Sequence, residues 1–397
     1  MPVPARSDVL IIGGGLIGLA TAWRTAARGI SVTLCDPAPG TNASFAAAGM
    51  LTPVTELHYG EETLLGLNLA SAKRYPSFVA ELREASGGLD PGYTEAGTLA
   101  VAFDADDREV LSELHVFQQS LGLKAEWLSG REARRLEPML APGVRGGLLV
   151  SGDHQVDNRM LLAALFAALE RDPNATIVRT KVAELTVSAA GDRATGVVLE
   201  DGTALSADQV VLSAGCWSGQ IAGIPAELLP PVRPVKGQIL RLAVPDVFKP
   251  FLSRTVRYVV RNNHAYLVPR EHGELVLGAT VEEQDYDTAV TAGGVYELLR
   301  DARELVPGIT ELPLIESRAA LRPGTPDNAP LIGPTALPGL LYATGHYRHG
   351  VLLTPATADG VAEILATGTV PEALAPFSPQ RFAVPGMRPG RVRRNER

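Results

Sequence analysis

Near its N-terminus the chain reads Asp8-Val-Leu-Ile-Ile-Gly-Gly-Gly-Leu-Ile-Gly-Leu-Ala20. Residues 9–12 form a short apolar run rich in β-branched side chains, which predicts a strand. This run leads directly into glycines with GxGxxG spacing, at Gly13, Gly15 and Gly18. Gly13 permits a tight turn, Gly15 leaves room for a pyrophosphate against the backbone, and Gly18 lets helix and strand pack closely.

The residues that follow complete the same pattern. Leu16 to Arg28 is rich in helix formers, and Ser31 to Leu34 is a second β-like run that leads to Asp36. Strand, turn, helix, strand and acid in this order are typical of a dinucleotide-binding unit. The helix N-terminus offers unpaired N–H groups to phosphates, with Leu16 and Ile17 in its first turn. Asp36 can accept from a ribose 2′-hydroxyl, which favours FAD or NAD; the alternative is an ordinary strand–helix turn whose glycines serve packing.

Length, charge and cysteine content narrow the class of protein. The 397 residues predict two or three domains. The net charge of −8 does not favour binding to nucleic acid or to an anionic membrane. No apolar run approaches the ~20 residues that span a bilayer, and the N-terminus lacks the apolar region of a signal peptide. The only cysteines, Cys35 and Cys216, suit a reducing cytoplasm and provide no metal cluster, so we expect a cytoplasmic protein without a metal.

Small side chains dominate the segment after Asp36, which reads Pro-Ala-Pro-Gly-Thr-Asn-Ala-Ser-Phe-Ala-Ala-Ala-Gly-Met-Leu. Such a segment is too poor in large side chains to form a packed helix surface, but it can pass close to a flat ring system. We expect it to form a wall against the cofactor, and a flexible surface loop is the alternative. The candidate wall residues are Ser44, Ala47, Ala48, Gly49 and Met50.

Periodicity and turn residues predict the other elements. The expected helices cover 64–86, 107–121, 158–171, 295–305 and 354–367, the third with Asp157 or Asn158 as its N-cap. The expected strands cover 97–103, 146–151, 175–178, 182–188, 194–200, 209–212, 238–242, 255–260, 264–268, 274–277, 317–322 and 340–344. The apolar stripe of the first of these helices is expected to include Leu65, Leu67, Leu69, Ala72, Tyr75 and Phe78.

Two later segments extend the predicted cofactor site. The strand that ends at Leu212 leads into a second turn of small residues, where Ala214, Gly215 and Trp217 can close the cofactor from another side. Val182 presents its backbone groups to an adenine if its strand lies beside the first unit. His154 precedes a helix and is expected to cap or pack.

Three motifs in the second half carry polar groups suited to chemistry. They are Asn263-His-Ala-Tyr-Leu-Val-Pro-Arg270, Ala320-Leu-Arg-Pro-Gly-Thr-Pro-Asp327 and Thr344-Gly-His-Tyr-Arg-His-Gly-Val-Leu-Leu353. His264 and Tyr266 are two residues apart and therefore share one face of a strand. Arg322 ends a strand, and in the third motif glycines bracket two histidines and an arginine before a helix.

Together with the GGGLIG turn, the SFAAAGM loop and the LVLGAT strand, these motifs resemble the D-amino-acid oxidase family of FAD flavoproteins, most closely its glycine oxidase branch. The resemblance covers about residues 8 to 368. It implies an α/β, mixed α+β, fold with a Rossmann-like FAD-binding domain of the GR2 type and an antiparallel-sheet substrate domain. The FAD-binding domain comprises 1–85, 145–230 and 325–383, the substrate domain 86–144 and 231–324, and residues 384–397 are expected to be a disordered tail.

The resemblance also implies roles for individual residues. Arg322 matches the arginine that clamps the substrate carboxylate, and Tyr266 matches the tyrosine that hydrogen-bonds it. Arg348 matches a second arginine at the mouth of the site, and His264 a nearby polar residue. A guanidinium fork fits a carboxylate bidentately, whereas Arg322 taken alone could equally form a structural salt bridge. The cofactor contacts implied in the third motif are His346, Arg348, Gly350, Val351 and Leu352.

The implied activity is FAD-dependent oxidation of glycine, sarcosine and small D-amino acids by O2. Its products are an imine or oxo acid, ammonia and hydrogen peroxide, and it supplies thiazole formation in thiamine synthesis. The FAD is expected to be non-covalent, since neither cysteine lies in an attachment motif. Implied partners are other copies of the chain, in a dimer or tetramer, and a thiazole synthase.

Three residues depart from the glycine oxidase pattern. Val281 replaces a methionine, which leaves the ranking among small substrates open, while Tyr347 and His349 replace phenylalanine and asparagine. Two other functions remain open: a D-amino-acid dehydrogenase that passes electrons to a quinone or another carrier, and a binding or RNA-modifying protein in which FAD is structural.

Overall fold

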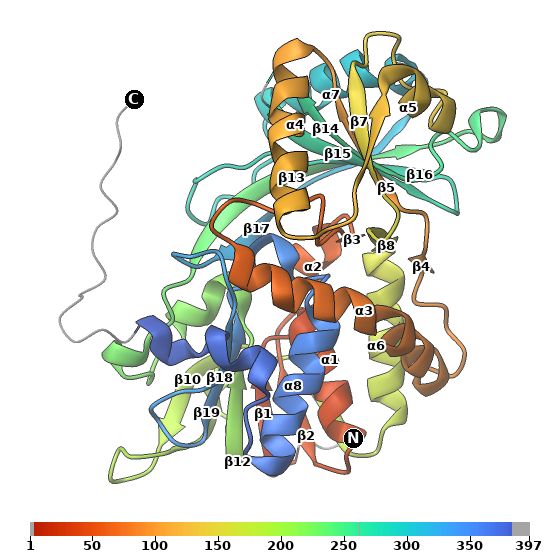
Figure 1. Cartoon of the computed structure of the whole chain (residues 1–397). Helices are drawn as coiled ribbons and strands as arrows, with labels where there is room; N and C mark the ends of the chain where they lie inside the picture. The colour runs from red at the N-terminus through yellow and green to blue at the C-terminus, as the bar shows by residue number, and fades with distance from the viewer. Residues whose placement is uncertain (1–3, 262, 383–397) are drawn as a thin grey trace.

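A computed structural model describes residues 4–261 and 263–382. The chain folds into two bodies, and Figure 1 shows them stacked, with the N-terminal strand β1 and helix α1 in the lower one. Each body contains an eight-stranded sheet. The tail expected at 384–397 lies outside the described residues.

The lower sheet has the strand order β10-β11-β12-β1-β2-β9, and β19 joins it by pairing with β12 and β18. Its strands β1, β2, β9, β12 and β19 run parallel to one another, and β10, β11 and β18 pair antiparallel. Parallel strands are covered on both faces, which explains the continuous apolar run at 9–12. The strands are β1 (Arg6–Ile12), β2 (Val32–Cys35), β9 (Ala175–Val178), β10 (Val182–Val187), β11 (Ala194–Leu199), β12 (Ala204–Leu212), β18 (Leu331–Pro334) and β19 (Leu340–Thr344).

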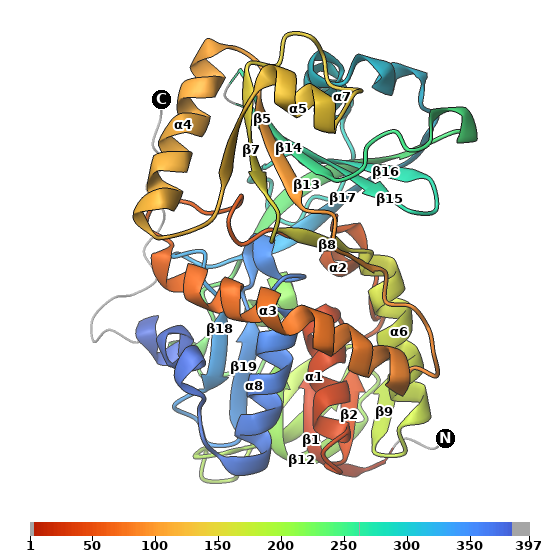
Figure 2. The same ribbon diagram turned by 45° about the vertical axis from the view of Figure 1, so that its right-hand side comes forward.

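Helices cover one face of this sheet. The helix α1 packs against α6 and α8, and α3 crosses over them, as Figure 2 shows. Their apolar sides form one core with β1 and β2, and a second core fills the opposite face of the sheet. Asp157 caps α6, as predicted. The helices are α1 (Leu16–Ala26), α3 (Glu62–Ala85), α6 (Asn158–Arg171) and α8 (Thr354–Thr367).

The upper sheet has the strand order β17-β13-β16-β15-β14-β5-β7-β6 and is antiparallel except for the pair β5–β14. Its outer face packs against α7 and α5 around a separate apolar core, and α4 covers its β5–β7 end. Its inner face looks onto the lower body. The elements are β5 (Thr98–Ala102), β6 (Glu126–Ser129), β7 (Gly146–Val150), β13 (Arg233–Ala243), β14 (Thr255–Val260), β15 (Asn263–Arg270), β16 (Glu274–Gly278), β17 (Leu314–Gly324), α4 (Ala105–Ser120), α5 (Gly130–Leu136) and α7 (Ala292–Leu305).

Short elements connect the two bodies. A three-stranded sheet contains β3 (Met50–Leu51), β8 (His154–Val156) and β4 (Tyr93–Thr94). The one-turn helix α2 (Ala43–Ala46) lies in the segment predicted to be a loop.

Short 3-10 helices lie in loops throughout the described residues. They are η1 (Gly215–Gln220), η2 (Ala226–Leu228), η3 (Asp246–Phe248), η4 (Pro307–Glu311), η5 (Tyr347–His349), η6 (Glu372–Phe377) and η7 (Pro379–Phe382).

Three expectations need adjustment. The strand β7 pairs with β5 and β6, so we propose to move the domain boundary expected before residue 145 to after Val150. Leu69 does not belong to the buried stripe of α3, since 37% of it is exposed. The predicted series of elements missed α5 and the strands β3, β4, β6, β8 and β18, which have seven residues or fewer and therefore show little periodicity. Among the described residues no helix is long and apolar enough to cross a membrane.

Candidate active site

One cavity of about 1010 Å³ lies at the carboxyl ends of β1, β2, β12 and β19, beneath the inner face of the upper sheet. In an open parallel sheet the carboxyl ends of the strands are the usual place for a ligand. The predicted site residues that line the cavity are Gly13, Gly15, Leu16, Ile17, Asp36, Ser44, Ala47, Ala48, Gly49, Met50, Val182, Ala214, Gly215, Trp217, His264, Tyr266, Arg322, His346, Arg348, Gly350 and Val351.

Two predicted cofactor contacts do not line the cavity. A Cβ at Gly18 would overlap the carbonyl oxygen of Gly13, so this glycine serves the close packing of helix against turn. Leu352 lies in the core beneath α8, and its carbonyl oxygen accepts a hydrogen bond from Ser71 Oγ at 2.6 Å. Its apolar side chain follows the packing of the helix rather than the cavity wall.

The glycine turn leaves a cradle that fits a dinucleotide. Gly13 has φ of +107°, and a Cβ there would overlap the backbone of Ser213. The helix α1 starts at Gly15 without a side-chain cap and has no acidic residue in its first turn. Its N-terminal N–H groups and dipole therefore suit phosphate. Asp36 lines the cavity while its carboxylate accepts from the N–H groups of Gly14 at 2.7 Å and Ala38 at 2.8 Å.

The wall segment of residues 43–50 is held from two sides. Ser44 Oγ accepts from the N–H of Leu16 at 2.9 Å, which fixes the segment against α1. Arg270 donates to the carbonyl oxygen of Ala48 at 2.7 Å, which fixes it against the upper sheet. Gly49 has φ of +71°, and a Cβ there would overlap the carbonyl oxygen of Val156. The small side chains of this segment thus follow from close contacts on both sides.

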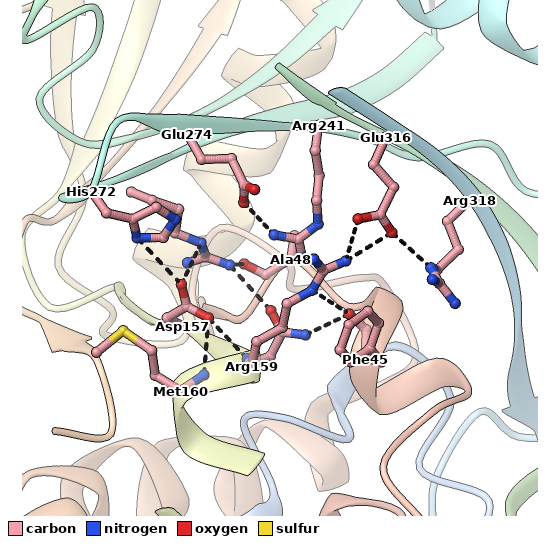
Figure 3. A network of polar contacts seen from close by, with 12 residues as sticks. Phe45, Ala48, Asp157, Arg159, Met160, Arg241, His272, Glu274, Glu316 and Arg318 are labelled. Atoms are coloured by element: carbon pink, nitrogen blue, oxygen red, sulfur yellow. Dashed lines mark hydrogen bonds and ion pairs between the residues drawn. The ribbon is translucent and has the colours of Figure 1, made fainter. Parts of the chain in front are cut away.

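Figure 3 shows the polar network that joins the two bodies beside this wall. Arg159 of α6 pairs with Glu316 of β17 at 2.8 Å, and Glu316 also accepts from Arg318. Phe45 lies under both guanidinium groups, 3.8 Å from that of Arg159 and 4.9 Å from that of Arg318. Nearby, Arg241 pairs with Glu274, and Asp157 faces Arg270. The network ties α2 and α6 to the upper sheet.

Val182 reaches the cavity by a route other than the expected one. The strand β10 lies at the end of the lower sheet, separated from β1 by β11 and β12, and β9 is the strand beside β2. Val182 nevertheless lines the cavity, because β9 ends at the cavity edge and the chain passes along it into β10.

At the sheet end of the cavity, two side chains lie flat over glycines of the neighbouring strands. A Cβ at Gly278 would overlap the ring of Tyr266, which is its register partner across β15 and β16. A Cβ at Gly237 would overlap the guanidinium of Arg322, which comes from β17. The two glycines therefore make room for a tyrosine and an arginine side by side on the inner face.

Among the described residues, Arg322 is held by backbone carbonyl groups and not by a carboxylate, as expected for an arginine that binds an anionic ligand. Its Nη1 donates to the carbonyl oxygen of Thr280 at 3.1 Å and, weakly, to that of Lys236 at 3.4 Å. Within residues 4–261 and 263–382 no carboxylate forms an ion pair with it. Burial raises the pKa of the adjacent Tyr266, although Arg322 acts in the opposite direction. The phenol is therefore neutral and its O–H is available as a donor.

The sequence analysis missed three charged residues of the cavity, Lys181, Glu56 and Arg257, and the last two form an ion pair. Glu56, in the segment between β3 and α3, pairs with Arg257 of β14 at 2.6 Å. Arg257 is the register partner of Tyr266 across the β14–β15 hairpin. A signal was present in the sequence: residues 256, 258 and 260 are apolar and face the core, so 257 must face the opposite side, together with Tyr266. Nothing local marks Glu56.

The third motif forms the tight turn between β19 and α8. Arg348 lines the cavity but pairs with Glu61, so its guanidinium is already neutralised. His346 Nε2 lies 3.0 Å from Thr357 Oγ1. His349 is buried, and among the described residues neither of its ring nitrogens has a hydrogen-bond partner. Burial lowers the pKa of both histidines to about 3, which keeps the turn uncharged at these positions.

Comparison with known proteins agrees with this geometry. The model of the DAO family, described as FAD dependent oxidoreductase, matches residues 8–364. The chain therefore belongs to this family of FAD-dependent oxidoreductases, and its cofactor is FAD.

Two relatives are similar to this chain over most of its length. The chain is 36% identical over 383 residues to the bifunctional protein ThiO/ThiG of Synechocystis sp., covering 95% of this chain and 54% of that protein, so it spans about half of that relative. It is 34% identical over 376 residues to the glycine oxidase of Geobacillus kaustophilus, covering 94% and 96% of the two chains.

Solved structures have the same fold. The crystal structure of the Geobacillus kaustophilus glycine oxidase, 34% identical, gives a TM-score of 0.86 over 95% of this chain and 99% of that one. The iminodiacetate oxidase of Chelativorans sp. BNC1, 28% identical, gives 0.82 over 94% and 98%. Glycine, in the name of the first protein, has one carboxylate, and iminodiacetate, in the name of the second, has two.

Proposed function

We propose that the protein is an FAD-dependent amino-acid oxidase that acts on glycine and similar small amines, such as sarcosine and small D-amino acids. The observation that carries this proposal is Arg322, a guanidinium in the cavity that has backbone partners and no protein carboxylate within the described residues. A fixed guanidinium fork beside a neutral phenol is suited to a substrate carboxylate.

The residues at the sheet end bind and orient the substrate. Arg322 donates two parallel hydrogen bonds to the carboxylate, and the O–H of Tyr266 donates to one of the carboxylate oxygens. These two contacts hold the substrate Cα toward the wall of small residues, where the flavin ring fits. Orientation of this kind supplies much of the rate when no proton has to be moved by a side chain.

When bound, FAD would supply the two-electron oxidation of the substrate Cα–N bond, with O2 as the acceptor that becomes hydrogen peroxide. Water hydrolyses the resulting imine to the oxo acid and ammonia. The turn of residues 345–353 lines this region with Gly345, His346 and Gly350 and carries no charged histidine at neutral pH. We propose that backbone N–H groups of this turn stabilise negative charge that develops during the reaction.

The FAD is proposed to be held without a covalent bond. Both cysteines reach the cavity, but both are buried, and burial raises the pKa of each thiol to about 12. A thiol in that state is a poor nucleophile. Release of all the flavin on acid precipitation of the protein is the expected result.

The mouth of the cavity supports a range of small substrates. Val281 lines it with 68% of its surface exposed. A short side chain at an open edge sets only a weak upper limit on the substituent at the amine or at Cα. This is the reason for including sarcosine and D-alanine beside glycine.

We also propose that the imine product supplies thiazole formation in thiamine synthesis, with a thiazole synthase as partner. The support is that this chain matches about half of the bifunctional protein ThiO/ThiG. In that relative a segment similar to this chain is joined to a second one.

The experiment that tests the proposal is anaerobic mixing of the purified yellow protein with glycine, sarcosine and D-alanine, followed by admission of oxygen. Loss of the flavin absorbance on mixing, then its recovery with formation of peroxide, is the expected result. Reduction without reoxidation by oxygen would indicate a dehydrogenase that uses another acceptor. A flavin that no amino acid reduces would contradict the proposal.

A further inference from the structure

Three guanidinium groups line the cavity, those of Arg257, Arg322 and Arg348. They differ in what they face. Arg257 and Arg348 are each paired with a glutamate of the segment 52–61, which connects β3 to α3, whereas Arg322 is not. The segment thus pairs two of the three guanidinium groups of the cavity with a carboxylate.

The pair of Arg257 and Glu56 is the deeper of the two. Its Nη1–Oε1 distance is 2.6 Å, and Thr52 Oγ1 donates to the other oxygen of Glu56 at 3.0 Å. Both side chains are largely buried. Burial alone would raise the pKa of Glu56, but Arg257, His349 and Arg348 together lower it to about 2. Glu56 is therefore ionised throughout the neutral range.

Arg257 also lies within reach of the substrate position. It is the cross-strand partner of Tyr266, and it acts on the pKa of both Tyr266 and His264. A second carboxylate on a substrate held by Arg322 and Tyr266 would approach Arg257. This second carboxylate would also approach the carboxylate of Glu56, which pairs with Arg257.

The second pair, Arg348 and Glu61, also joins a cavity arginine to a glutamate that a further hydrogen bond holds in place. Arg348 pairs with Glu61, whose second oxygen accepts from the side chain of Asn328 at 3.2 Å. Glu61 thereby connects the segment 52–61, to which it belongs, with the loop before β18. Its charge cannot swing away from Arg348 without loss of both contacts.

We propose that Glu56 and Glu61 determine how many carboxylates the substrate end of the site accepts: by pairing with Arg257 and Arg348 they leave Arg322 as the one guanidinium of the cavity without a carboxylate partner among the described residues, so the enzyme selects amines with a single carboxylate. Arg257 is then a latent site for a second carboxylate, closed by Glu56. A like charge placed beside a poorly solvated carboxylate is disfavoured more strongly than at a solvated surface. This inference rests on the proposed function.

The test compares glycine with two diacids, iminodiacetate and D-aspartate, in the flavin-loaded enzyme and its Glu56→Gln variant. The glutamine keeps the shape and the contact with Thr52 but removes the charge. The ratio of kcat/KM for diacid to kcat/KM for glycine is expected to rise by about tenfold or more. A ratio unchanged within about twofold would overturn the inference.

The gain must depend on Arg257. In the double variant Glu56→Gln, Arg257→Met the ratio is expected to return to the wild-type value, and a gain that persists would contradict the assignment. Glu81→Gln is the matched control, because Glu81 pairs with Arg24 and Arg74 and none of these three residues lines the cavity. If Glu56→Gln does not fold, Glu61→Gln provides the same test through Arg348.

Binding measured without turnover separates this inference from the proposed function. Flavin absorbance is titrated with acetate and with succinate, which are not oxidised. The ratio of the succinate to the acetate dissociation constant is expected to fall by about tenfold in Glu56→Gln. If glycine reduces the wild-type flavin while neither ratio changes, the proposed function stands and this inference fails. If glycine does not reduce the flavin, the proposed function fails, and the titration alone decides the charge assignment.

Discussion

At its glycine end the cavity presents backbone and small side chains, whereas at its sheet end it presents the guanidinium and phenol groups of Arg257, Tyr266 and Arg322. We expect the glycine end to bind the cofactor through shape, since the space that a Cβ would occupy at Gly13, Gly18 and Gly49 is already filled by backbone. We expect the sheet end to bind the substrate through functional groups, for which glycines on neighbouring strands leave room. Substitutions that add a Cβ at these glycines should prevent folding or flavin binding. Substitutions at the sheet end should leave the fold intact and change the affinity for the substrate.

The largest effect is expected at the glycine end, from Gly18→Ala. Its Cβ would overlap the carbonyl oxygen of Gly13, and neither backbone can move without displacing the turn. The variant should be recovered without flavin or in insoluble form, as shown by the ratio of flavin to protein absorbance. Gly66→Ala is the control, because Gly66 is exposed in α3 with open space at its Cβ, and it should stabilise the protein by about 1 kcal/mol. A soluble Gly18→Ala protein with full flavin content would contradict the expectation that the glycine end tolerates no Cβ at this position.

The next effect is expected at the sheet end, from Arg322→Leu. Loss of the carboxylate partner should lower kcat/KM for glycine by about a hundredfold or more, through KM above all. The flavin content should remain that of the wild type, since Arg322 packs on Gly237 and not on the cofactor wall. Exposed Arg303→Leu on α7 serves as the control in the same steady-state assay. Loss of flavin together with activity would show that the two ends are not independent.

His349→Asn tests a side chain that is buried between the two ends. The pKa of His349 in the folded protein, about 3, lies below its ordinary value of 6.5, so its stabilising contribution is complete above pH 6.5 and is lost as the pH falls toward 3. Between pH 7.5 and pH 5 the wild type should lose about 2 kcal/mol that the variant does not lose. Thermal or urea unfolding of both flavin-loaded proteins at the two pH values measures the difference. Equal losses in both proteins would mean that His349 is solvated when folded.

The smallest effect is expected from Tyr266→Phe, which removes one hydroxyl and no volume. A single hydrogen bond to a charged carboxylate corresponds to about tenfold in kcat/KM for glycine. Tyr258→Phe is a matched control, because Tyr258 is on the adjacent strand, faces the core, and has no partner for its hydroxyl among the described residues. It should leave both activity and flavin content unchanged. An equal loss in both variants would indicate a packing effect of the sheet rather than substrate binding.

The two ends also differ in how well the sequence predicted them. Apart from Gly18, the residues predicted for the glycine end line the cavity, because glycine spacing, the apolar run and Asp36 lie within 30 residues and the pattern is carried by the backbone. Leu352, predicted from the third motif, does not line the cavity either. Spacing places a residue near a turn, but packing decides which side of the turn faces the cavity.

At the sheet end the predictions from the residues themselves were weaker. Tyr266 and His264 were placed on one face by their spacing of two, and both line the cavity. The resemblance, rather than any local pattern, pointed to Arg322. Glu56 was missed, because its pairing with Arg257 joins residues 201 positions apart that no periodicity connects.

The sequence by itself determined the Rossmann-like unit, the order of strands and helices and the family, because these follow from local propensity, glycine conformations and short motifs. Only the tertiary structure decided the charge state of the site. Arg257, Arg322 and Arg348 are equivalent as residue types, and the path of the segment 52–61 leaves a single one of them without a carboxylate among the described residues. Ion pairing depends on distances of a few ångströms between distant segments, and such distances arise only when both bodies have packed.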